Sequence, residues 1–215
     1  MSPTSVNPVD HPKTARASQH LQGVCKAADA GYKVIIVLAG LHNNLRSQTQ
    51  IRLEESFLGY ETSANRDHGK LIGVAEIDSD PDIHPHCATT RANNRDFNTS
   101  VARNFAISPE KRPWLFVVKK NKSVLTRLLK WIQGHVADTT DAVTRHRIVT
   151  RLPLLVIDDE ADNASVDTGE QLFNADGTPD DNHQPRAING LIRKILHFEN
   201  EFAFCAKDIH APIWQ

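Results

Sequence analysis

Four short apolar runs recur along the chain, and polar segments separate them. They cover residues 33–39 (KVIIVLA), 114–118 (WLFVV), 154–157 (LLVI) and 202–206 (FAFCA). Strands that are buried on both faces of a parallel sheet consist of aliphatic and β-branched residues in continuous runs of this length. The four runs therefore predict the strands of a mostly parallel sheet.

Between these runs, the residues predict helices. The predicted helices cover residues 21–28, a polar segment that starts at Asn43 or Asn44, residues 124–132 and residues 188–196. All but the polar one show apolar residues at the spacing of a helix face. We expect an asparagine to cap the polar helix and Asn121 or Ser123 to cap the next, because short polar side chains accept hydrogen bonds from unpaired backbone amides. Strands that alternate with helices predict an α/β fold in which helices flank the sheet.

Two parts of the chain lack such a pattern. Residues 1–17 contain three prolines among small polar residues, so we expect a disordered leader. Residues 59–110 are rich in Asn, Asp, Thr, Ser and His, and only LIGVAEI, which begins at Leu71, suggests a strand. A chain of 215 residues suits one domain.

The composition is that of an ordinary folded protein. Charged residues make up 24% of the chain, hydrophobic residues 40%, and the formal net charge is -1. The longest apolar run, at 34–41, is far shorter than the roughly 20 residues that span a bilayer, and no secretory signal is present, which predicts a cytoplasmic protein without membrane contact. Cys25, Cys87 and Cys205 are far apart in sequence and are expected to be buried free thiols.

Charge is distributed unevenly along the chain. Residues 111–151 hold ten Lys or Arg against two acids, whereas residues 152–185 hold nine acids and no Lys or Arg. A basic surface beside an acidic cation site suits a protein that handles polyphosphates or nucleic acid. Two solvated faces that bind nothing are the alternative interpretation.

Four carboxylates follow the third apolar run within five residues, in PLLVIDDEAD (153–162). Ligands of parallel α/β sheets bind at the carboxyl ends of the strands, and Mg²⁺ prefers oxygen ligands. We therefore predict a site for Mg²⁺ and ATP. In it, Asp159 binds the metal, Asp158 supports the metal's coordination shell, and Glu160 activates the water that attacks the γ-phosphate. The alternative is that these acids only cap the next helix.

Three longer blocks carry a resemblance to a known family. They are CKAADAGYKVIIVLAGLHNNLRSQTQIRLEESFLGY (25–60), RPWLFVVKKNKSVLTRLLKWI (112–132) and PLLVIDDEADNASVDT (153–168). They resemble the Z1-domain endonucleases, whose ATPase part is similar to superfamily 2 DEAD-type helicases, and the likeness covers most of residues 21–197. The resemblance implies a RecA-like P-loop NTPase fold, ATP and Mg²⁺ as cofactors, and DNA as a partner. It also implies a place among proteins of DNA restriction or defence.

The resemblance further implies roles for individual residues. Asp159 and Glu160 take the metal-binding and water-activating roles of a Walker B motif, and Asp162 couples hydrolysis to motion. The turn after the first strand resembles the helicase motif that touches a nucleic-acid strand, through Asn43, Asn44, Arg46 and Gln48. Alternatively, the two asparagines cap the helix, and Arg46 and Gln48 lie on its solvated face.

The chain departs from the family pattern at both ends. The family has a glycine-rich GK[ST] phosphate loop before the first helix, where this chain has Lys13 and Thr14 after a proline. The family continues from its FAFCA-like strand into a Thr-Ala-Thr motif and a second RecA-like domain, where this chain reads KDIHAPIWQ. We expect 18–206 to form an incomplete RecA-like ATPase domain and 207–215 a tail foreign to the family, so that the chain is a truncated or frame-shifted fragment.

Two other groups of residues have a possible chemical role. The loop DSDPDIHPHC offers the metal ligands Asp80, Asp82, His84, His86 and Cys87. Zinc sites take ligand pairs from two separated places, and no second pair is evident, which favours a surface loop. Two tryptophans, at positions 114 and 131, could stack on bases, but they adjoin apolar stripes and are expected in the core.

The sequence leaves three functions open. The first is the ATPase part of an ATP-dependent endonuclease, in which no nuclease centre is evident beyond the acids of the ATP site. The second is a non-catalytic nucleotide- or nucleic-acid-binding module without a Walker A loop. The third is a DNA-binding face formed by residues 111–151.

Overall fold

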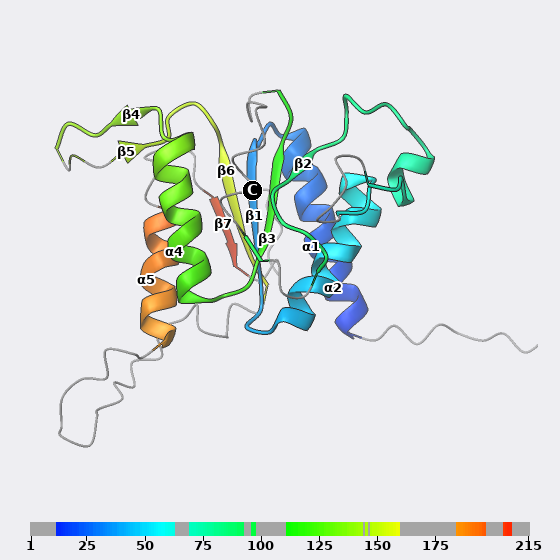
Figure 1. The fold of residues 1–215 in the computed structure, drawn as a ribbon, viewed down its shortest axis with the longest axis horizontal. Helices are drawn as coiled ribbons and strands as arrows, with labels where there is room; N and C mark the ends of the chain where they lie inside the picture. Colours follow the sequence, from blue (N-terminus) through cyan, green and yellow to red (C-terminus); the bar gives the residue numbers. More distant parts are fainter. Residues whose placement is uncertain are drawn as a thin grey trace, which may run out of the picture.

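The computed structural model describes residues 12–62, 69–92, 96–97, 111–143, 145, 147–159, 184–196 and 204–207, and only the backbone at 12–20, 184–186 and 204–207. Within these ranges the chain is an α/β protein, with a parallel sheet between two layers of helices (Figure 1). The predicted class, α/β with a mostly parallel sheet and flanking helices, is confirmed at this level.

Five strands form the sheet in the order β2-β3-β1-β6-β7, and every neighbouring pair is parallel. Their bounds are β1 Val34–Ala39, β2 His86–Cys87, β3 Trp114–Val118, β6 Leu154–Asp159 and β7 Phe204–Lys207. Val34 of β1 pairs with Trp114 of β3 on one side and with Leu154 of β6 on the other. The three central strands therefore start side by side and end at the same edge of the sheet.

Helices cover both faces of this sheet (Figure 1). On one face lie α1 (Pro12–Asp29), α2 (Asn43–Leu53) and the π-helical turn η1 (Glu54–Leu58), which continues α2. On the other face lie α4 (Lys122–Trp131), its π-helical continuation η3 (Ile132–Val136) and α5 (Gln184–Leu196). The short elements are the 3-10 turn η2 (Gly73–Glu76) and the hairpin of β4 (Thr139–Thr140) and β5 (Arg147–Ile148). Within the described ranges, no helix has both the length and the apolar character that crossing a bilayer requires.

Strand β1 separates two hydrophobic cores, because successive side chains of a strand point to opposite faces. Its even-numbered residues, from Val34 to Leu38, pack in the core that contains α4 and α5. Its odd-numbered residues, from Ile35 to Ala39, pack in the core that contains α1, α2 and η1. A strand that is buried on both faces needs an apolar residue at each position, which explains the continuous apolar run in the sequence.

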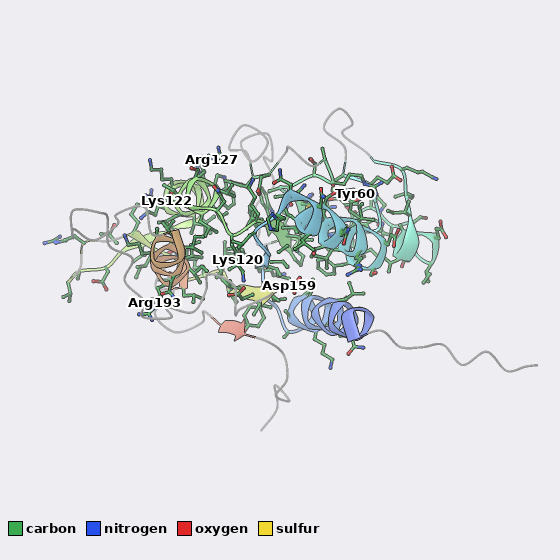
Figure 2. All side chains as sticks on the ribbon, turned by 90° about the horizontal axis from the view of Figure 1, so that it is seen from below. Tyr60, Lys120, Lys122, Arg127, Asp159 and Arg193 are labelled. Carbon is green, nitrogen blue, oxygen red and sulfur yellow. The ribbon has the colours of Figure 1, made fainter. Side chains whose placement is uncertain are left out.

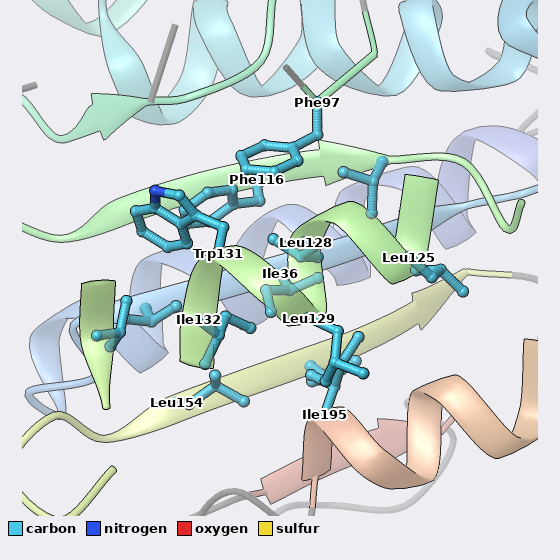
Figure 3. Close-up of a cluster of buried hydrophobic side chains, with 14 of the residues drawn as sticks. Ile36, Phe97, Phe116, Leu125, Leu128, Leu129, Trp131, Ile132, Leu154 and Ile195 are labelled. Atoms are coloured by element: carbon cyan, nitrogen blue, oxygen red, sulfur yellow. The ribbon is translucent and has the colours of Figure 1, made fainter. Parts of the chain in front are cut away.

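Aromatic rings fill the core between β3 and α4 (Figure 3). The ring centroids of Phe97 and Phe116 lie 5.7 Å apart, and those of Phe116 and Trp131 lie 5.1 Å apart. Trp114 stacks on Trp131 with a centroid separation of 5.5 Å. Pairs of this kind contribute about 0.5–1.5 kcal/mol beyond the burial of their area. The prediction that both tryptophans belong to the core is confirmed.

The two helices that follow β3 and β1 begin differently. Asn121 caps α4 as predicted, since its Oδ1 accepts hydrogen bonds from the N–H groups of Ser123 and Val124 at 3.0 and 3.3 Å. Helix α2 has His42 at the cap position, without a side-chain hydrogen bond. The prediction that an asparagine caps α2 is therefore wrong, although the helix does begin at Asn43.

Three boundaries differ from the sequence prediction. Helix α1 begins at Pro12, because the fixed φ of proline suits a first helical turn, so residues 12–17 of the expected leader are helical. The segment LIGVAEI is not a strand: it contains η2, and only Leu71 makes a β-bridge, to Tyr60. Strand β7 extends to Lys207, one residue past the predicted end of the domain.

A substitution at Gly73 tests how closely η2 packs against η1. Its φ is +55°, and a Cβ atom there would lie 1.8 Å from the backbone oxygen of Glu55. A left-handed conformation costs a non-glycine residue about 1–3 kcal/mol, and the collision with a backbone atom adds to that cost. We expect Gly73→Ala to lower the free energy of unfolding by at least about 1 kcal/mol, measured by urea denaturation.

Gly134 in η3 is the matched control, because no atom of the described residues lies within 4 Å of a Cβ added there and its φ is not positive. Gly134→Ala should leave stability unchanged or raise it by about 0.4–1 kcal/mol. Equal destabilisation by both substitutions would contradict this account of Gly73.

Candidate functional site

The end of the sheet where β1, β3 and β6 finish, called the carboxyl edge here, carries two of the predicted acids, Asp158 and Asp159. Asp158 of β6 pairs in register with Leu38 of β1. On the other side of β1, the backbone N–H of Lys120 donates to the carbonyl of Gly40 at 2.8 Å. Strand pairing thus brings Lys120, which follows β3, and Asp158 to the two sides of β1.

Lys120 and Asp158 form an ion pair across the end of β1. Lys120 Nζ lies 2.6 Å from Asp158 Oδ1, and both side chains are 0% exposed. Removing two charges from water is costly, and apolar residues of similar size are often as stable as a buried ion pair, or more so. Stability alone therefore does not account for the pair, which points to a requirement for these charges at the carboxyl edge.

Asp158 lies below the surface, and its support of the metal's coordination shell stays a prediction. Its Oδ2 receives no hydrogen bond from the part of the chain that the structure describes. Because strand residues alternate in direction, Asp158 points into the protein, and the next residue, Asp159, is partly exposed. Figure 2 shows Lys120 and Asp159 between the two helix layers. Glu160 and Asp162 lie outside the described residues, and their roles stay predictions.

The turn after β1 forms the rim of the carboxyl edge. Asn43 begins α2, and its Oδ1 accepts a hydrogen bond from Nζ of the partly exposed Lys119 at 2.9 Å. Asn44 and Gln48 are exposed. Their contact with a nucleic-acid strand therefore stays a prediction, and the rim offers amide groups and an ammonium group to a ligand.

Arg46 faces inward, against both interpretations of it from the sequence. Its side chain is 0% exposed, and its Nη1 and Nη2 donate to the carbonyls of Thr90 and Ala92 at 2.8 and 2.7 Å. Burial lowers the pKa of the guanidinium, and nearby acids led by Asp96 partly oppose this. Because the guanidinium anchors the segment 90–92, Arg46 is neither on a solvated face nor available to a nucleic-acid strand.

Arg46 belongs to a buried polar face of α2 and η1 that the sequence did not predict. Its members are Arg46, Ser47, Gln50 and Glu54. Ser47 Oγ donates to the carbonyl of Arg91 at 2.6 Å. The carboxylate of Glu54 accepts hydrogen bonds from the guanidinium of Arg91. The sequence signal for this face is the absence of an apolar stripe in α2.

Gln50 links this polar face to the sheet. Its Oε1 accepts a hydrogen bond from Thr89 Oγ1 at 2.8 Å, and Thr89 Oγ1 accepts one from the N–H of Val117 in β3 at 3.0 Å. Gln50 Nε2 also donates to Cys87 Sγ at 3.3 Å. Helix α2 is therefore fixed to the neighbouring strands by hydrogen bonds as well as by apolar packing.

The predicted loop of possible metal ligands is only partly a surface loop. His86 and Cys87 form β2 beside β3, and His84 is buried, whereas Asp80 and Asp82 are exposed. Burial raises the pKa of the Cys87 thiol, which disfavours the thiolate that zinc needs. Among the described residues, no three His, Cys, Asp or Glu side chains are grouped so as to hold a metal ion.

Asp96 is a carboxylate near the rim that the sequence did not single out. Its Oδ1 accepts a hydrogen bond from the N–H of Phe97 at 2.9 Å. Burial raises the pKa of Asp96, and the positive charges of Arg46 and Lys119 partly oppose the rise. No motif surrounds Asp96 in the sequence, so only tertiary structure reveals that it lies near these two cations.

Among the described carboxylates, Asp159 is the best placed to bind a cation at this edge. It ends β6 and is partly exposed. Mg²⁺ keeps several waters and takes one or two protein carboxylates together with substrate phosphates, so a single aspartate can suffice on the protein side. Lys119 and the amides of the rim can hydrogen-bond phosphate oxygens.

No protein-family model, curated protein or solved structure matches this chain. The resemblance to the Z1-domain endonucleases therefore stays an expectation from the quoted blocks, and the side chains of the carboxyl edge carry the functional inference.

Removing one charge of the Lys120–Asp158 pair tests whether the two groups are buried as an ion pair. Lys120→Met keeps a long side chain and leaves the Asp158 carboxyl without its counter-ion. We expect the free energy of unfolding, measured in urea, to fall by about 3–5 kcal/mol, the usual cost of breaking a buried ion pair.

The double variant Lys120→Met/Asp158→Leu removes both charges and should recover most of that loss, because apolar replacement of a buried pair is often neutral. Lys119→Met changes the neighbouring, partly exposed lysine and should alter stability by less than about 0.5 kcal/mol. A loss at position 119 as large as that at position 120 would contradict the burial argument.

Proposed function

We propose that the chain is a magnesium–nucleotide module of the RecA-like class, the ATPase part of an ATP-dependent endonuclease of the Z1-domain type. The observation that carries the proposal is the buried Lys120–Asp158 ion pair beside Asp159, at the carboxyl edge of a parallel sheet. Open parallel α/β sheets bind their ligands at this edge. A charged pair that is costly to bury is supporting evidence for a site there.

Because Asp158 is held in the ion pair, Asp158 and Asp159 have different roles in the proposed site. Lys120 offsets the charge of Asp158, so the pair contributes a fixed local field and little net charge. Asp159 is then the carboxylate that meets Mg²⁺, on a strand whose position is fixed by pairing with β1. A rigid ligand suits phosphoryl transfer, in which positioning and electrostatics supply most of the catalysis.

The remaining roles follow the resemblance of PLLVIDDEAD to a Walker B motif. Glu160 orients the attacking water and accepts its proton, and Asp162 couples hydrolysis to motion. DNA is the partner, and restriction or defence is the setting that the family implies. The nuclease activity rests on the family resemblance alone, because the described residues show no group of three or more His, Cys, Asp or Glu that could serve as its centre.

A non-catalytic nucleotide- or nucleic-acid-binding module is the second candidate. The observation that favours it is in the sequence, which contains no GK[ST] phosphate loop. Such a module keeps the sheet and the acids, binds its ligand through the carboxyl edge, and does not turn it over.

Asp159→Asn tests the metal role. The amide keeps the size of the side chain and removes the charge that Mg²⁺ requires, so we expect the dependence of ATP affinity on Mg²⁺ to be lost. Titration of the chain with ATP by calorimetry, with and without Mg²⁺, measures this. The wild-type chain should bind ATP at least tenfold more tightly with Mg²⁺ than without it.

Asp29→Asn is the matched control, since Asp29 is an exposed aspartate at the end of α1, before β1 begins. It should keep the full effect of Mg²⁺. ATP binding that is indifferent to Mg²⁺ in the wild-type chain, or an equal loss in both variants, would refute the site.

Glu160→Gln separates the two candidate functions. If the chain hydrolyses ATP, the loss of the proton acceptor should reduce phosphate release by about a hundredfold or more and leave binding of ATP with Mg²⁺ unchanged. Phosphate release is measured under excess ATP. Retained binding without any turnover in the wild-type chain would favour the non-catalytic module over the enzyme.

A further inference from the structure

The outer side of the α4–α5 layer carries only positive charge among its described side chains. The exposed charged residues of the two helices, called the basic face here, are Lys122, Arg127, Lys130, Arg193 and Lys194. No Asp or Glu occurs within α4 or α5. The basic segment 111–151 contributes α4 to this face, and α5, which lies outside that segment, contributes Arg193 and Lys194.

Among the residues that the structure describes, the cations of the basic face form no ion pair with an acid. Elsewhere in the described chain, Arg91, Arg112 and Lys120 form ion pairs with Glu54, Asp82 and Asp158. Within the described ranges, none of the five residues of the basic face takes part in an ion pair. Like charges that are close together and unpaired repel each other, so an anionic ligand is the natural complement of this face.

The two helices that carry the five residues are neighbours. Helices α4 and α5 pack together through a shared core that includes Leu125, Leu129, Ile188 and Ile192, and Figure 1 shows them side by side. Along α4, the spacing of the cations places the first and last about 12 Å apart, at 1.5 Å of rise per residue. Figure 2 shows Lys122 and Arg127 beside α4 and Arg193 beside α5.

The hairpin that follows η3 carries arginines together with two acids, Asp138 and Asp141. Arg145, beside the turn of the hairpin, and Arg151, which follows β5, are exposed. In Figure 1 the hairpin lies next to the end of α4. The positive charge of α4 and α5 therefore borders a segment of mixed charge that adds two exposed arginines.

The kind of surface narrows the class of polyanion. The large exposed apolar residues of the described chain lie outside α4 and α5, and one of them, Val143, lies in the turn of the hairpin. The two helices themselves have no apolar group to insert into a membrane. The aromatic residue of α4, Trp131, is buried, so the face offers no ring for stacking on the bases of a single strand. What remains is the sequence-independent recognition of regularly spaced phosphates.

We propose that the basic face binds the phosphate backbone of a nucleic acid duplex. The contacts are charge-assisted hydrogen bonds from ammonium and guanidinium groups to phosphate oxygens, and they release counterions from the duplex. The inference does not rest on the nucleotide site at the carboxyl edge. Asp159→Asn should therefore leave duplex affinity unchanged, which separates a failure of one proposal from a failure of the other.

The test is fluorescence anisotropy with a labelled 20-base-pair DNA duplex of arbitrary sequence. The wild-type chain should bind with micromolar affinity at 50 mM salt, and affinity should fall steeply as salt rises. The triple variant Arg127→Glu/Lys130→Glu/Arg193→Glu should bind at least tenfold more weakly. Its slope of log affinity against log salt should be shallower by about 2.7, the value for three lost phosphate contacts.

The matched control is Lys26→Glu/Arg52→Glu/Lys70→Glu, which changes net charge equally at exposed positions away from α4 and α5. It should keep the wild-type slope and lose less than threefold in affinity. Absence of binding by the wild-type chain at 50 mM salt would overturn the proposal, as would an equal loss in the two triple variants.

A second copy of the chain is the competing occupant. Its complementary surface is the acidic lobe, made of the exposed residues Glu76, Asp78, Asp80 and Asp82. If the basic face binds a duplex and not a second copy of the chain, the chain alone should sediment as a monomer at low salt. A dimer that salt dissociates, and that Asp78→Lys/Asp80→Lys abolishes, would overturn the proposal in favour of self-association.

Discussion

Strand β1 is hydrogen-bonded along both edges and covered by helices on both faces, and the other parts of the structure depend on that placement. Pairing in register with β3 and β6 forces three strands to end together. The residues that follow β3 and end β6 are then neighbours across β1, so Lys120 and Asp158 meet although they are far apart in sequence. The candidate site is thus a consequence of strand register, and the rigidity of the sheet passes directly to Asp159.

Helix α2 shows a second way of fixing the carboxyl edge. Its inward side uses Arg46, Ser47 and Gln50, where an amphipathic helix would present aliphatic residues. Hydrogen bonds have narrow requirements of distance and angle, so a satisfied polar network specifies one arrangement more sharply than apolar packing does. The same network holds residues 89–92 against α2, so the rim of the candidate site and the edge of the sheet near β2 form one connected structure.

Charge is segregated in space as it is along the chain. The α4–α5 layer presents lysines and arginines without acids, whereas the described segment from η2 to residue 82 presents mainly acids. The buried pair of Lys120 and Asp158 lies between these regions, at the end of the sheet. Opposite charges on two sides of one small protein produce a field that orients it relative to any charged partner.

The sequence by itself determined the three central strands, a helix cap at Asn121 or Ser123 and the core position of Trp114 and Trp131, because periodicity and local hydrogen bonding are encoded by neighbouring residues. It could not determine the burial of Arg46, since an arginine in a polar helix normally faces water. Nor could it reveal that LIGVAEI turns at Gly73. Tertiary structure alone decided that Lys120 neutralises Asp158 and that α5 completes a basic surface with α4, because both depend on contacts between residues distant in sequence.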